Sequence, residues 1–283
     1  MYKIVDCRFI NPSVKLFEIE APAIATNRRA KPGQFIILRI NEDGERIPIT
    51  IADCNPQTRT VTIIVQGIGK TTNLLLSKEK GDFVLDIVGP LGKPTHIEKF
   101  GVCVVIGGGV GTAIAYPTAK ALKEAGNKVI VIIGGRTAEL AILKDEISAF
   151  ADEVYVTTDD GSAGEKGLVT DKLRSLINTI NVDYVLAIGP IMMMKAVADT
   201  TNTPEHIIPT VVSLNPVMLD GTGMCGGCRA IVGGKNVFVC VDGPEFDAHQ
   251  VDFNTLLKRN ASYAIQESCS LCAFKEKYGL LNN

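Results

Sequence analysis

The residues best suited to chemistry lie near the C-terminus, in the stretch Asp220-Gly-Thr-Gly-Met-Cys225-Gly-Gly-Cys228, with Cys240 further on. Plant-type 2Fe–2S sites use the spacing C-x4-C-x2-C and a distant fourth cysteine. This chain has D-x4-C-x2-C-x11-C, with a carboxylate in the first position. Glycines between these residues fit a loop whose backbone wraps a cluster and donates N–H groups to its sulfides. The spacing therefore indicates an iron–sulfur site.

Two alternatives bear on this stretch. Cys225 and Cys228 could pair with Cys269 and Cys272 as two zinc knuckles, although the 40 residues between them exceed the ~15–20 of that spacing. Asp220 could be a turn residue before a glycine, with the fourth ligand supplied by the tail pair. Zinc is the less favoured metal, and coordination of iron by the Asp220 carboxylate is the favoured hypothesis.

A second chemical signal is the glycine-rich run VIGGGVGTAIAYP at residues 105–117, which follows an apolar strand and opens a helix. Glycines let a backbone approach a phosphate, and a helix N-terminus offers free N–H groups. The match to G-x-G-x-x-G is imperfect, and a plain strand-to-helix turn is the alternative. Gly189-Pro190 and Asp159-Asp160 follow other apolar strands, where ligands of parallel sheets bind.

A third signal is Arg46-Ile47-Pro48-Ile49-Thr50. Arginine can bind a diphosphate with two hydrogen bonds, and Thr50 lies two strand steps further on the same face. The alternative is an ordinary exposed strand. The turn Gly67-Ile68-Gly69-Lys70-Thr71-Thr72 contains G-K-T but lacks the first glycine of a P-loop, so a nucleotide triphosphatase is not indicated.

The elements that must position these residues change character along the chain. Residues 1–97 hold six short β-branched runs separated by turns, which indicates an antiparallel barrel or sandwich. From residue 102, continuous apolar runs alternate with helical stretches, which predicts a doubly wound parallel sheet. The expected fold is thus a β-barrel plus α/β, in three parts with boundaries at 1–98, 99–212 and 213–283. The predicted helices span 112–126, 138–150, 169–178 and 190–199.

Composition excludes several classes of protein. The net charge is −2, without the basic excess of a nucleic-acid surface. The uncharged run 101–119 is interrupted by glycines and a proline, so it does not predict a membrane helix. The N-terminus lacks the apolar core of an export signal, and clustered cysteines in such a chain favour metal over disulfides. A cytoplasmic location is expected.

Taken in order, R-x-P-x-T, GGGVG, TDDGSAG, GP-x-M and the cysteine loop resemble the ferredoxin–NADP reductase superfamily. Within it, the whole chain looks like the small subunits of NADH-dependent reduced ferredoxin:NADP oxidoreductases, also known as sulfide dehydrogenase subunits. The stretches SLNPVMLDGTGMCGGCR and CVDGPEFDAHQVDF carry this likeness. The electron-transfer subunits of dihydroorotate dehydrogenases are similar, but have cysteine where Asp220 stands.

This resemblance implies roles for individual residues. The barrel would bind FAD, with Arg46 at the diphosphate and Thr50 near the reactive edge of the flavin. The α/β domain would bind NAD(H), and the C-terminal segment a 2Fe–2S cluster. The residues implied for FAD are Arg46, Ile47, Pro48, Ile49, Thr50, Gly69, Thr71 and Thr72; for the nucleotide Gly108, Gly109, Val110, Gly111, Thr112, Arg136, Asp160, Gly189 and Pro190; and for the cluster Asp220, Cys225, Cys228 and Cys240.

The choice of nucleotide is ambiguous in the sequence. Arg136 follows the second parallel strand, where an arginine usually binds the 2′-phosphate of NADP. The resemblance instead implies NAD(H) on this subunit and NADP(H) on a larger flavin and iron–sulfur partner, in a heterodimer that exchanges electrons with ferredoxin through that partner. We expect NAD(H), with NADP(H) as the alternative.

The expected function is therefore that of an oxidoreductase subunit, which passes electrons between NAD(H), FAD and a 2Fe–2S cluster and a partner within an electron-bifurcating complex. Flavin exchanges two electrons with the nucleotide and the cluster carries one at a time, so no catalytic base is needed. One alternative is the electron-transfer subunit of a dihydroorotate or sulfide dehydrogenase. The other is a non-enzymatic nucleotide-binding protein with structural zinc.

Overall fold

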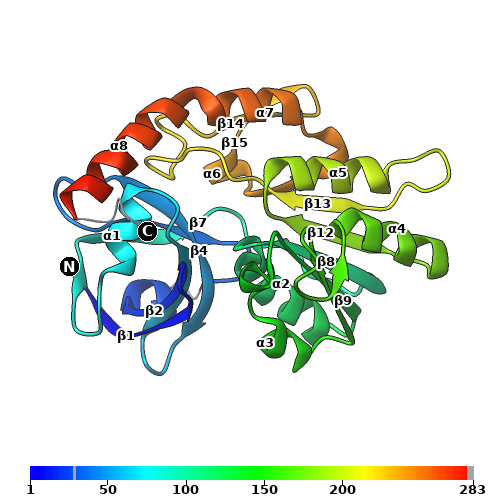
Figure 1. The fold of residues 1–283 in the computed structure, drawn as a ribbon, viewed down its shortest axis with the longest axis horizontal. Helices are drawn as coiled ribbons and strands as arrows, with labels where there is room; N and C mark the ends of the chain where they lie inside the picture. The colour runs from blue at the N-terminus through cyan, green and yellow to red at the C-terminus, as the bar shows by residue number, and fades with distance from the viewer. Residues whose placement is uncertain (28–29, 279–283) are drawn as a thin grey trace.

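The β-branched runs of the first hundred residues form one antiparallel sheet, curved into a half-barrel (Figure 1). In the computed structural model, which describes residues 1–27 and 30–278, its strand order is β6-β1-β2-β5-β4-β3-β7. Burial alternates along β2 and β5, so one face of each strand packs into the core. The predicted antiparallel element is confirmed. Its strands are β1 (Tyr2–Asn11), β2 (Val14–Glu20), β3 (Phe35–Arg39), β4 (Arg46–Asn55), β5 (Thr60–Gln66), β6 (Phe83–Val84) and β7 (Asp86–Leu91).

The second sheet has the order β11-β10-β9-β8-β12-β13-β16 and is parallel except at β16. Its central strands are buried on both faces, as their continuous apolar runs predict. One hydrophobic cluster lies under α2 and α3, and another under α4 and α5, which confirms the doubly wound arrangement. The strands are β8 (Val102–Gly108), β9 (Lys128–Gly135), β10 (Glu153–Thr158), β11 (Glu165–Lys166), β12 (Tyr184–Ile188), β13 (Thr210–Ser213) and β16 (Glu245–Asp247); the helices are α2 (Gly111–Glu124), α3 (Lys144–Ser148), α4 (Val169–Thr179) and α5 (Ile191–Thr201).

The cysteine-rich segment leaves the parallel sheet at its edge and returns to the same edge. The chain departs after Ser213 of β13, and β16 pairs back on β13 with Ser213 opposite Glu245. Between them lie the cluster loop, which we define as residues 215–228, and a small two-stranded sheet. The elements of this segment are β14 (Arg229–Val232), β15 (Lys235–Phe238) and α6 (Val239–Asp242).

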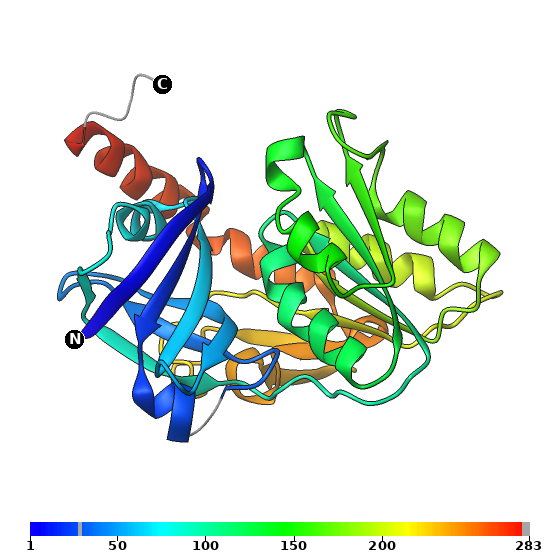
Figure 2. The same ribbon diagram turned by 90° about the horizontal axis from the view of Figure 1, so that it is seen from below.

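Two helices at the C-terminal end bridge the molecule. Helix α7 (Phe253–Asn260) packs on β14, and α8 (Ala264–Lys277) extends over the half-barrel and contacts α1 (Lys70–Leu76). Figures 1 and 2 show α8 running along the half-barrel in both views. In the part of the chain that the structure describes, no helix combines the length and the apolar character required to cross a bilayer. Among the described residues, short helical turns also lie at Ala23–Asn27, Ala138–Leu140, Ala248–Gln250 and Ala261–Tyr263.

Thr95, in the linker between the two sheets, forms hydrogen bonds to the half-barrel and to the second sheet. The N–H of Thr95 donates to the carbonyl of Pro32 in the half-barrel (2.9 Å), and its hydroxyl donates to Glu245 of β16 (2.8 Å). Burial raises the pKa of the Glu245 carboxyl to about 7, and the hydrogen bond from Thr95 opposes that rise. A carboxyl whose pKa is raised in the folded state favours folding when it is protonated, so the free energy of unfolding should fall as the pH rises from 4.5 to about 7.

A buried lysine fixes α1, the helix that follows the turn at residues 67–69. Lys15 of β2 is 1% exposed, and its ammonium group donates to the carbonyls of Leu76 (3.2 Å) and Lys78 (2.7 Å). The same group forms an ion pair with Glu79 at 2.8 Å. A cation at a helix C-terminus satisfies carbonyls that have no partner within the helix. Lys15 thus anchors α1 to the half-barrel.

Candidate functional site

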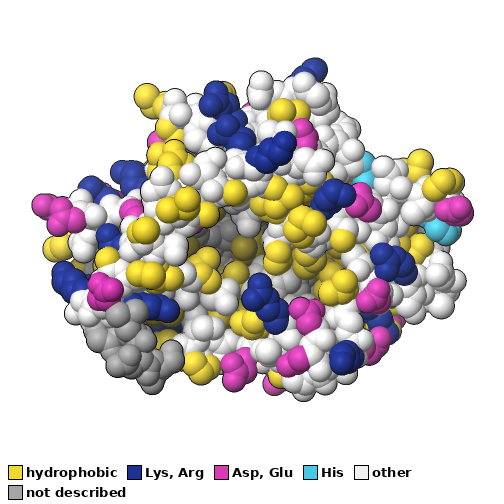
Figure 3. Space-filling view, turned by 45° about the horizontal axis from the view of Figure 1, so that its top comes forward, with side chains coloured by type: hydrophobic (Ala, Val, Ile, Leu, Met, Phe, Trp, Pro, Cys, Tyr) yellow, Lys and Arg dark blue, Asp and Glu magenta, His cyan; other side chains and the backbone are white. Residues whose placement is uncertain are grey.

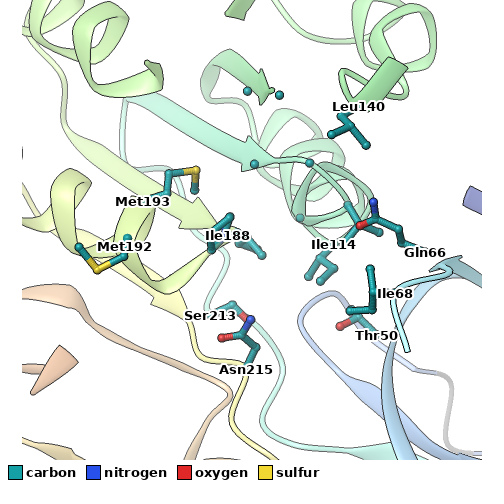
Figure 4. Close-up of a pocket in the computed structure, with 18 of the residues that line it drawn as sticks. Thr50, Gln66, Ile68, Ile114, Leu140, Ile188, Met192, Met193, Ser213 and Asn215 are labelled. Atoms are coloured by element: carbon teal, nitrogen blue, oxygen red, sulfur yellow. The ribbon is translucent and has the colours of Figure 1, made fainter. Parts of the chain in front are cut away.

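A cavity of about 880 Å³ lies between the half-barrel and the carboxyl ends of the parallel strands. Figure 3 shows a hollow between the two lobes with hydrophobic side chains around it, and Figure 4 shows residues that line the cavity. The half-barrel contributes Pro48, Ile49 and Thr50, while the parallel sheet contributes Gly108 to Gly111 and Gly189. A largely apolar cavity with a few polar groups is typical of a cofactor site.

The glycine-rich loop follows β8. Strands β9 and β12 pair with β8 on opposite sides, so the loop lies at the topological switch point of the sheet. A Cβ on Gly108 would come within 2.5 Å of Met193 Sδ, and one on Gly111 within 2.3 Å of the Ile188 carbonyl oxygen. The loop is thus packed tightly against the end of β12. Gly109 has a φ of +56° and open space beside it, so its backbone can face a ligand closely.

Replacing Gly111 by alanine should damage nucleotide binding, because the new Cβ would strike backbone atoms that cannot move aside. The start of α2 would have to shift, and a displacement of about 1 Å at such a site can cost about 100-fold in rate. We expect kcat/KM for NADH to fall by about that factor.

Gly126→Asn at the other end of α2 is the control, since that position has open space and a φ of +86° that asparagine tolerates. Unchanged NADH kinetics in Gly111→Ala would show that the close packing of this loop is not needed.

On the flavin side, Ile47, Pro48, Ile49 and Thr50 line the cavity, as predicted for the R-x-P-x-T motif. Arg46 does not line it, but its Nε atom is buried and has no hydrogen-bond partner among the described residues. A buried, unpaired donor on a permanent cation fits an absent anionic group such as a diphosphate. The half-barrel therefore suits the predicted FAD.

The second predicted flavin loop is partly a helix. Residues 67–69 form the turn, and α1 begins at Lys70, where the sequence indicated only a turn. The hydroxyl of Thr72 accepts the N–H of Ile68 (3.0 Å) and of Gly69 (2.9 Å) while lining the cavity. Thr71 is buried and donates to the carboxylate of Glu45. Thr72 therefore faces the cavity, while Thr71 and Gly69 support the turn from outside it.

Of the residues predicted to bind the nucleotide, some line the cavity and others do not. Val110, Pro190 and Arg136 line the cavity. Thr112 does not, since its side chain is fully buried and its hydroxyl has no partner among the described residues. Asp160 does not line the cavity either, whereas its neighbour Asp159 does.

Asp220 stands at the entrance to the cluster loop and organises its backbone. One carboxylate oxygen accepts the N–H of Thr222 (2.9 Å) and the other that of Cys225 (2.7 Å). The hydrogen bond from Thr222, followed by that from Cys225, holds the pKa of this carboxyl below its usual range. Asp220 is thus ionised and shapes the backbone of the loop, and each of its oxygens keeps a lone pair that could bind a metal.

The three cysteines differ in exposure. Cys228 and Cys240 are buried with their sulfur atoms 3.2 Å apart, and burial raises the pKa of Cys240 to about 12. Cys225 is exposed, and its sulfur accepts the N–H of Gly227 at 3.4 Å. Paired thiols with backbone N–H donors fit an iron–sulfur group. Within the described residues, no three such side chains converge on a single metal-ion position.

The tail pair lies apart from these sulfurs. Cys269 and Cys272 are both exposed on α8, which packs toward α1 of the half-barrel. In the described chain, these two thiols join no group of three or more metal-ligating side chains. Their arrangement gives no support to two zinc knuckles.

The cluster loop packs directly on the half-barrel and on α7. A Cβ on Gly221, whose φ is +74°, would meet Leu91 at 2.6 Å and Ile37 at 2.9 Å. Arg259 of α7 donates to the carbonyl of Gly227 at 3.1 Å. The cluster loop therefore lies between the half-barrel, which is expected to hold FAD, and the C-terminal helices.

Sequence reasoning missed one wall of the cavity. Ser213, Asn215, Pro216 and Met218 line it, and they belong to the stretch that continues into Asp220. Figure 4 shows Ser213 and Asn215 from this wall near Ile188. These residues belong to the stretch SLNPVMLDGTGMCGGCR that carries the family resemblance, but the sequence analysis did not assign them to a cofactor site. Other lining residues that the sequence analysis did not assign to the site are Gln66, Ile68, Ile114, Leu140, Met192 and Met193.

Together, the half-barrel, the switch-point cavity and the cysteine loop define a flavin- and nicotinamide-dependent oxidoreductase with an iron–sulfur segment. Residues 105–199 match the model of the oxidoreductase NAD-binding domain, and residues 215–252 match that of the iron–sulfur cluster binding domain of dihydroorotate dehydrogenase B. The chain belongs to the family of dihydroorotate dehydrogenase B electron transfer subunits and their homologues. The prediction of iron–sulfur rather than zinc is thereby confirmed.

Individual relatives are similar over nearly the whole chain. A Thermotoga maritima homologue of the dihydroorotate dehydrogenase B (NAD(+)) electron transfer subunit is 48% identical, over 93% of this chain and 92% of the relative. A probable subunit of the same kind from Methanopyrus kandleri is 35% identical, over 79% and 82%. A solved NADH-dependent reduced ferredoxin-NADP oxidoreductase, described in connection with flavin-based electron bifurcation, superposes with a TM-score of 0.90 at 45% identity, covering 97% and 98%.

These comparisons confirm the predicted fold class and the expected cofactors, which are FAD, a 2Fe–2S cluster and NAD(H). They confirm an oxidoreductase subunit that works in electron transfer. Phthalate dioxygenase reductase, at 15% identity and a TM-score of 0.60, shares the fold.

Proposed function

We propose that this chain is the NADH-oxidising subunit of a larger complex, in which it passes electrons from NAD(H) through FAD to a 2Fe–2S cluster and on to a partner flavoprotein. The observation that carries the proposal is the shared cavity. Its walls are the R-x-P-x-T strand, the glycine-rich loop and the stretch 213–218, which includes the first residues of the cluster loop. One site thus borders all three predicted cofactor positions.

The groups themselves supply two-electron and one-electron carriers. The chain's residues would hold them: Arg46 pairs with the flavin diphosphate, and Thr50 lies on the cavity side of the same strand. The N–H of Gly109 donates to the carbonyl of Gly134 (2.7 Å), so backbone N–H groups just after it, at the start of α2, would face the nucleotide phosphates. The apolar lining, including Ile188 and Met193, would exclude water from the place where the nicotinamide ring meets the flavin ring.

For the cluster, we propose Asp220, Cys225, Cys228 and Cys240 as ligands. Support comes from the paired sulfurs of Cys228 and Cys240 and from the match of this segment to the iron–sulfur domain model. We also propose the three-part division at residues 98 and 212, with β16 counted in the α/β part because it pairs with β13.

Relatives named as electron transfer subunits imply a partner subunit. We propose a larger flavin and iron–sulfur subunit that exchanges electrons with ferredoxin and NADP(H), as the name of the 45% identical structure suggests. A second candidate is the electron transfer subunit of a dihydroorotate dehydrogenase, which the names of the sequence relatives favour. Purification of the native complex distinguishes them by whether dihydroorotate or reduced ferredoxin is oxidised.

Anaerobic titration of the purified chain with NADH tests the proposal. We expect bleaching of the flavin absorbance and an EPR signal of a reduced 2Fe–2S cluster. Reaction should be weaker with NADPH. A protein whose flavin and cluster stay oxidised with NADH would contradict the proposal, and a clear preference for NADPH would contradict its assignment of the nucleotide.

A further inference from the structure

Two oppositely charged residues stand side by side at one end of the cavity. Strands β9 and β10 run parallel with Thr158 opposite Gly135, so the next residues, Arg136 and Asp159, leave the sheet together. Backbone hydrogen bonds continue this register, since the N–H of Asp159 donates to the Gly135 carbonyl at 3.1 Å. The placement of the pair is therefore fixed by the sheet itself.

Both residues line the cavity and are exposed. Among the described residues, neither side chain forms an ion pair or a hydrogen bond, so both can engage a ligand. Asp160 differs, because its carboxylate accepts the N–H (2.9 Å) and the hydroxyl (2.6 Å) of Ser162. Those bonds lower the pKa of Asp160 and hold its side chain within its own turn.

This end of the cavity is where the adenosine ribose of a dinucleotide should lie. The pyrophosphate binds at the first strand-to-helix turn, and the ribose extends toward the end of the next strand. That next strand is β9, which ends just before Arg136. A carboxylate there accepts a hydrogen bond from the 2′-hydroxyl of NAD, whereas an arginine accommodates the 2′-phosphate of NADP. This chain presents one of each.

We propose that Asp159 is the specificity-determining residue that makes the subunit select NADH over NADPH despite Arg136. The Asp159 carboxylate accepts a hydrogen bond from the 2′-hydroxyl of NADH and repels the 2′-phosphate of NADPH. Its negative charge also offsets the positive charge with which Arg136 would attract that phosphate. Like charges brought together at a binding site are a strong means of rejecting the wrong ligand. The inference rests on the proposed use of NAD(H) and deepens it.

The test uses ligands that cannot be oxidised or reduced. ADP-ribose and 2′-phospho-ADP-ribose are titrated calorimetrically into the FAD-loaded chain, as wild type and as the Asp159→Asn variant, which keeps size but removes charge. We expect wild type to favour ADP-ribose, and Asp159→Asn to shift the ratio of the two dissociation constants toward the phosphorylated ligand by at least about tenfold. Adding Arg136→Ala to that variant should remove the gain.

Asp160→Asn is the matched control, with the same charge change at the next residue, and should leave the ratio within about twofold. The NADPH-to-NADH ratio of kcat/KM should follow the binding ratio in each variant. An unchanged ratio in Asp159→Asn, or an equal shift in Asp160→Asn, overturns the role of Asp159 if NADH still reduces the flavin. Failure of NADH to reduce the wild-type flavin would instead overturn the proposed function.

Discussion

Purified Arg46→Ala protein should contain little or no flavin while retaining its iron. The reason is the buried, unpaired Nε of Arg46 on β4, which the diphosphate of FAD would satisfy. Hydrogen bonds between charged groups contribute about 1.5–3 kcal/mol each, so losing a two-bond contact should weaken FAD binding by more than about 100-fold. Flavin absorbance per polypeptide and iron content per polypeptide are the two measurements.

The adjacent strand offers a matched control. Arg39 of β3 lies directly opposite Arg46 in the antiparallel register, but its guanidinium is paired with Asp86 at 2.6 Å. Arg39→Ala removes the same side chain from the same sheet, so it should keep its flavin. Full flavin occupancy in Arg46→Ala, or an equal loss in Arg39→Ala, would remove Arg46 from the proposed site.

The second large effect is expected at Asp220. If its carboxylate binds iron, Asp220→Ala should lose or destabilise the cluster, whereas Asp220→Cys should retain a 2Fe–2S centre with altered EPR signal and potential. Carboxylate and thiolate carry the same charge, but oxygen is a harder ligand and donates less electron density to iron. Iron and sulfide content, EPR spectra and a redox titration measure these outcomes.

The hydrogen bonds of Asp220 allow its two possible roles to be distinguished. Both carboxylate oxygens accept backbone N–H groups, and an asparagine keeps one such acceptor. A residue needed only for the turn would therefore tolerate Asn better than Cys, while a metal ligand would tolerate Cys better than Asn. Native EPR in Asp220→Asn together with cluster loss in Asp220→Cys would contradict the ligand role.

The tail cysteines complete this experiment. Cys269 and Cys272 lie exposed on α8, so the double variant Cys269→Ser/Cys272→Ser should keep its cluster. Loss of the cluster in that variant, with an unchanged signal in Asp220→Ala, would show that the tail supplies the fourth ligand.

The backbone frame of the site could be predicted from sequence because its signals are local. Apolar runs, glycine turns and β-branched alternation each reflect a few consecutive residues, and the strands and main helices lie close to where these patterns place them. Two stretches are exceptions. The helix predicted at 138–150 is a short turn at Ala138–Leu140 followed by the five-residue α3 (Lys144–Ser148). The other exception is residues 67–72. Their glycines favour a turn, but Lys15 of β2 donates to the carbonyl of Leu76 at the end of α1 and so holds the helix. Lys15 lies 61 residues before Leu76, so this contact is not visible in the local sequence.

Side-chain direction could not be predicted in the same way. Asp159 and Asp160 are the same residue type, but Asp159 lines the cavity, whereas the carboxylate of Asp160 accepts hydrogen bonds from Ser162 within its own turn. Ser213 and Asn215 line a wall that exists only after β13 joins the sheet edge. Such choices depend on contacts distant in the chain, which a single sequence does not display.

The return of β16 to β13 has a consequence for how this protein is built. Ser213 and Glu245 are cross-strand neighbours, and antiparallel strands in that relation can be joined by a two-residue hairpin. Residues 214–244 therefore have the topology of an insertion within one hairpin, whose two ends meet at a single point on the sheet. A nucleotide-binding domain of this kind could acquire or lose an electron-carrying module there without any strand changing its neighbours.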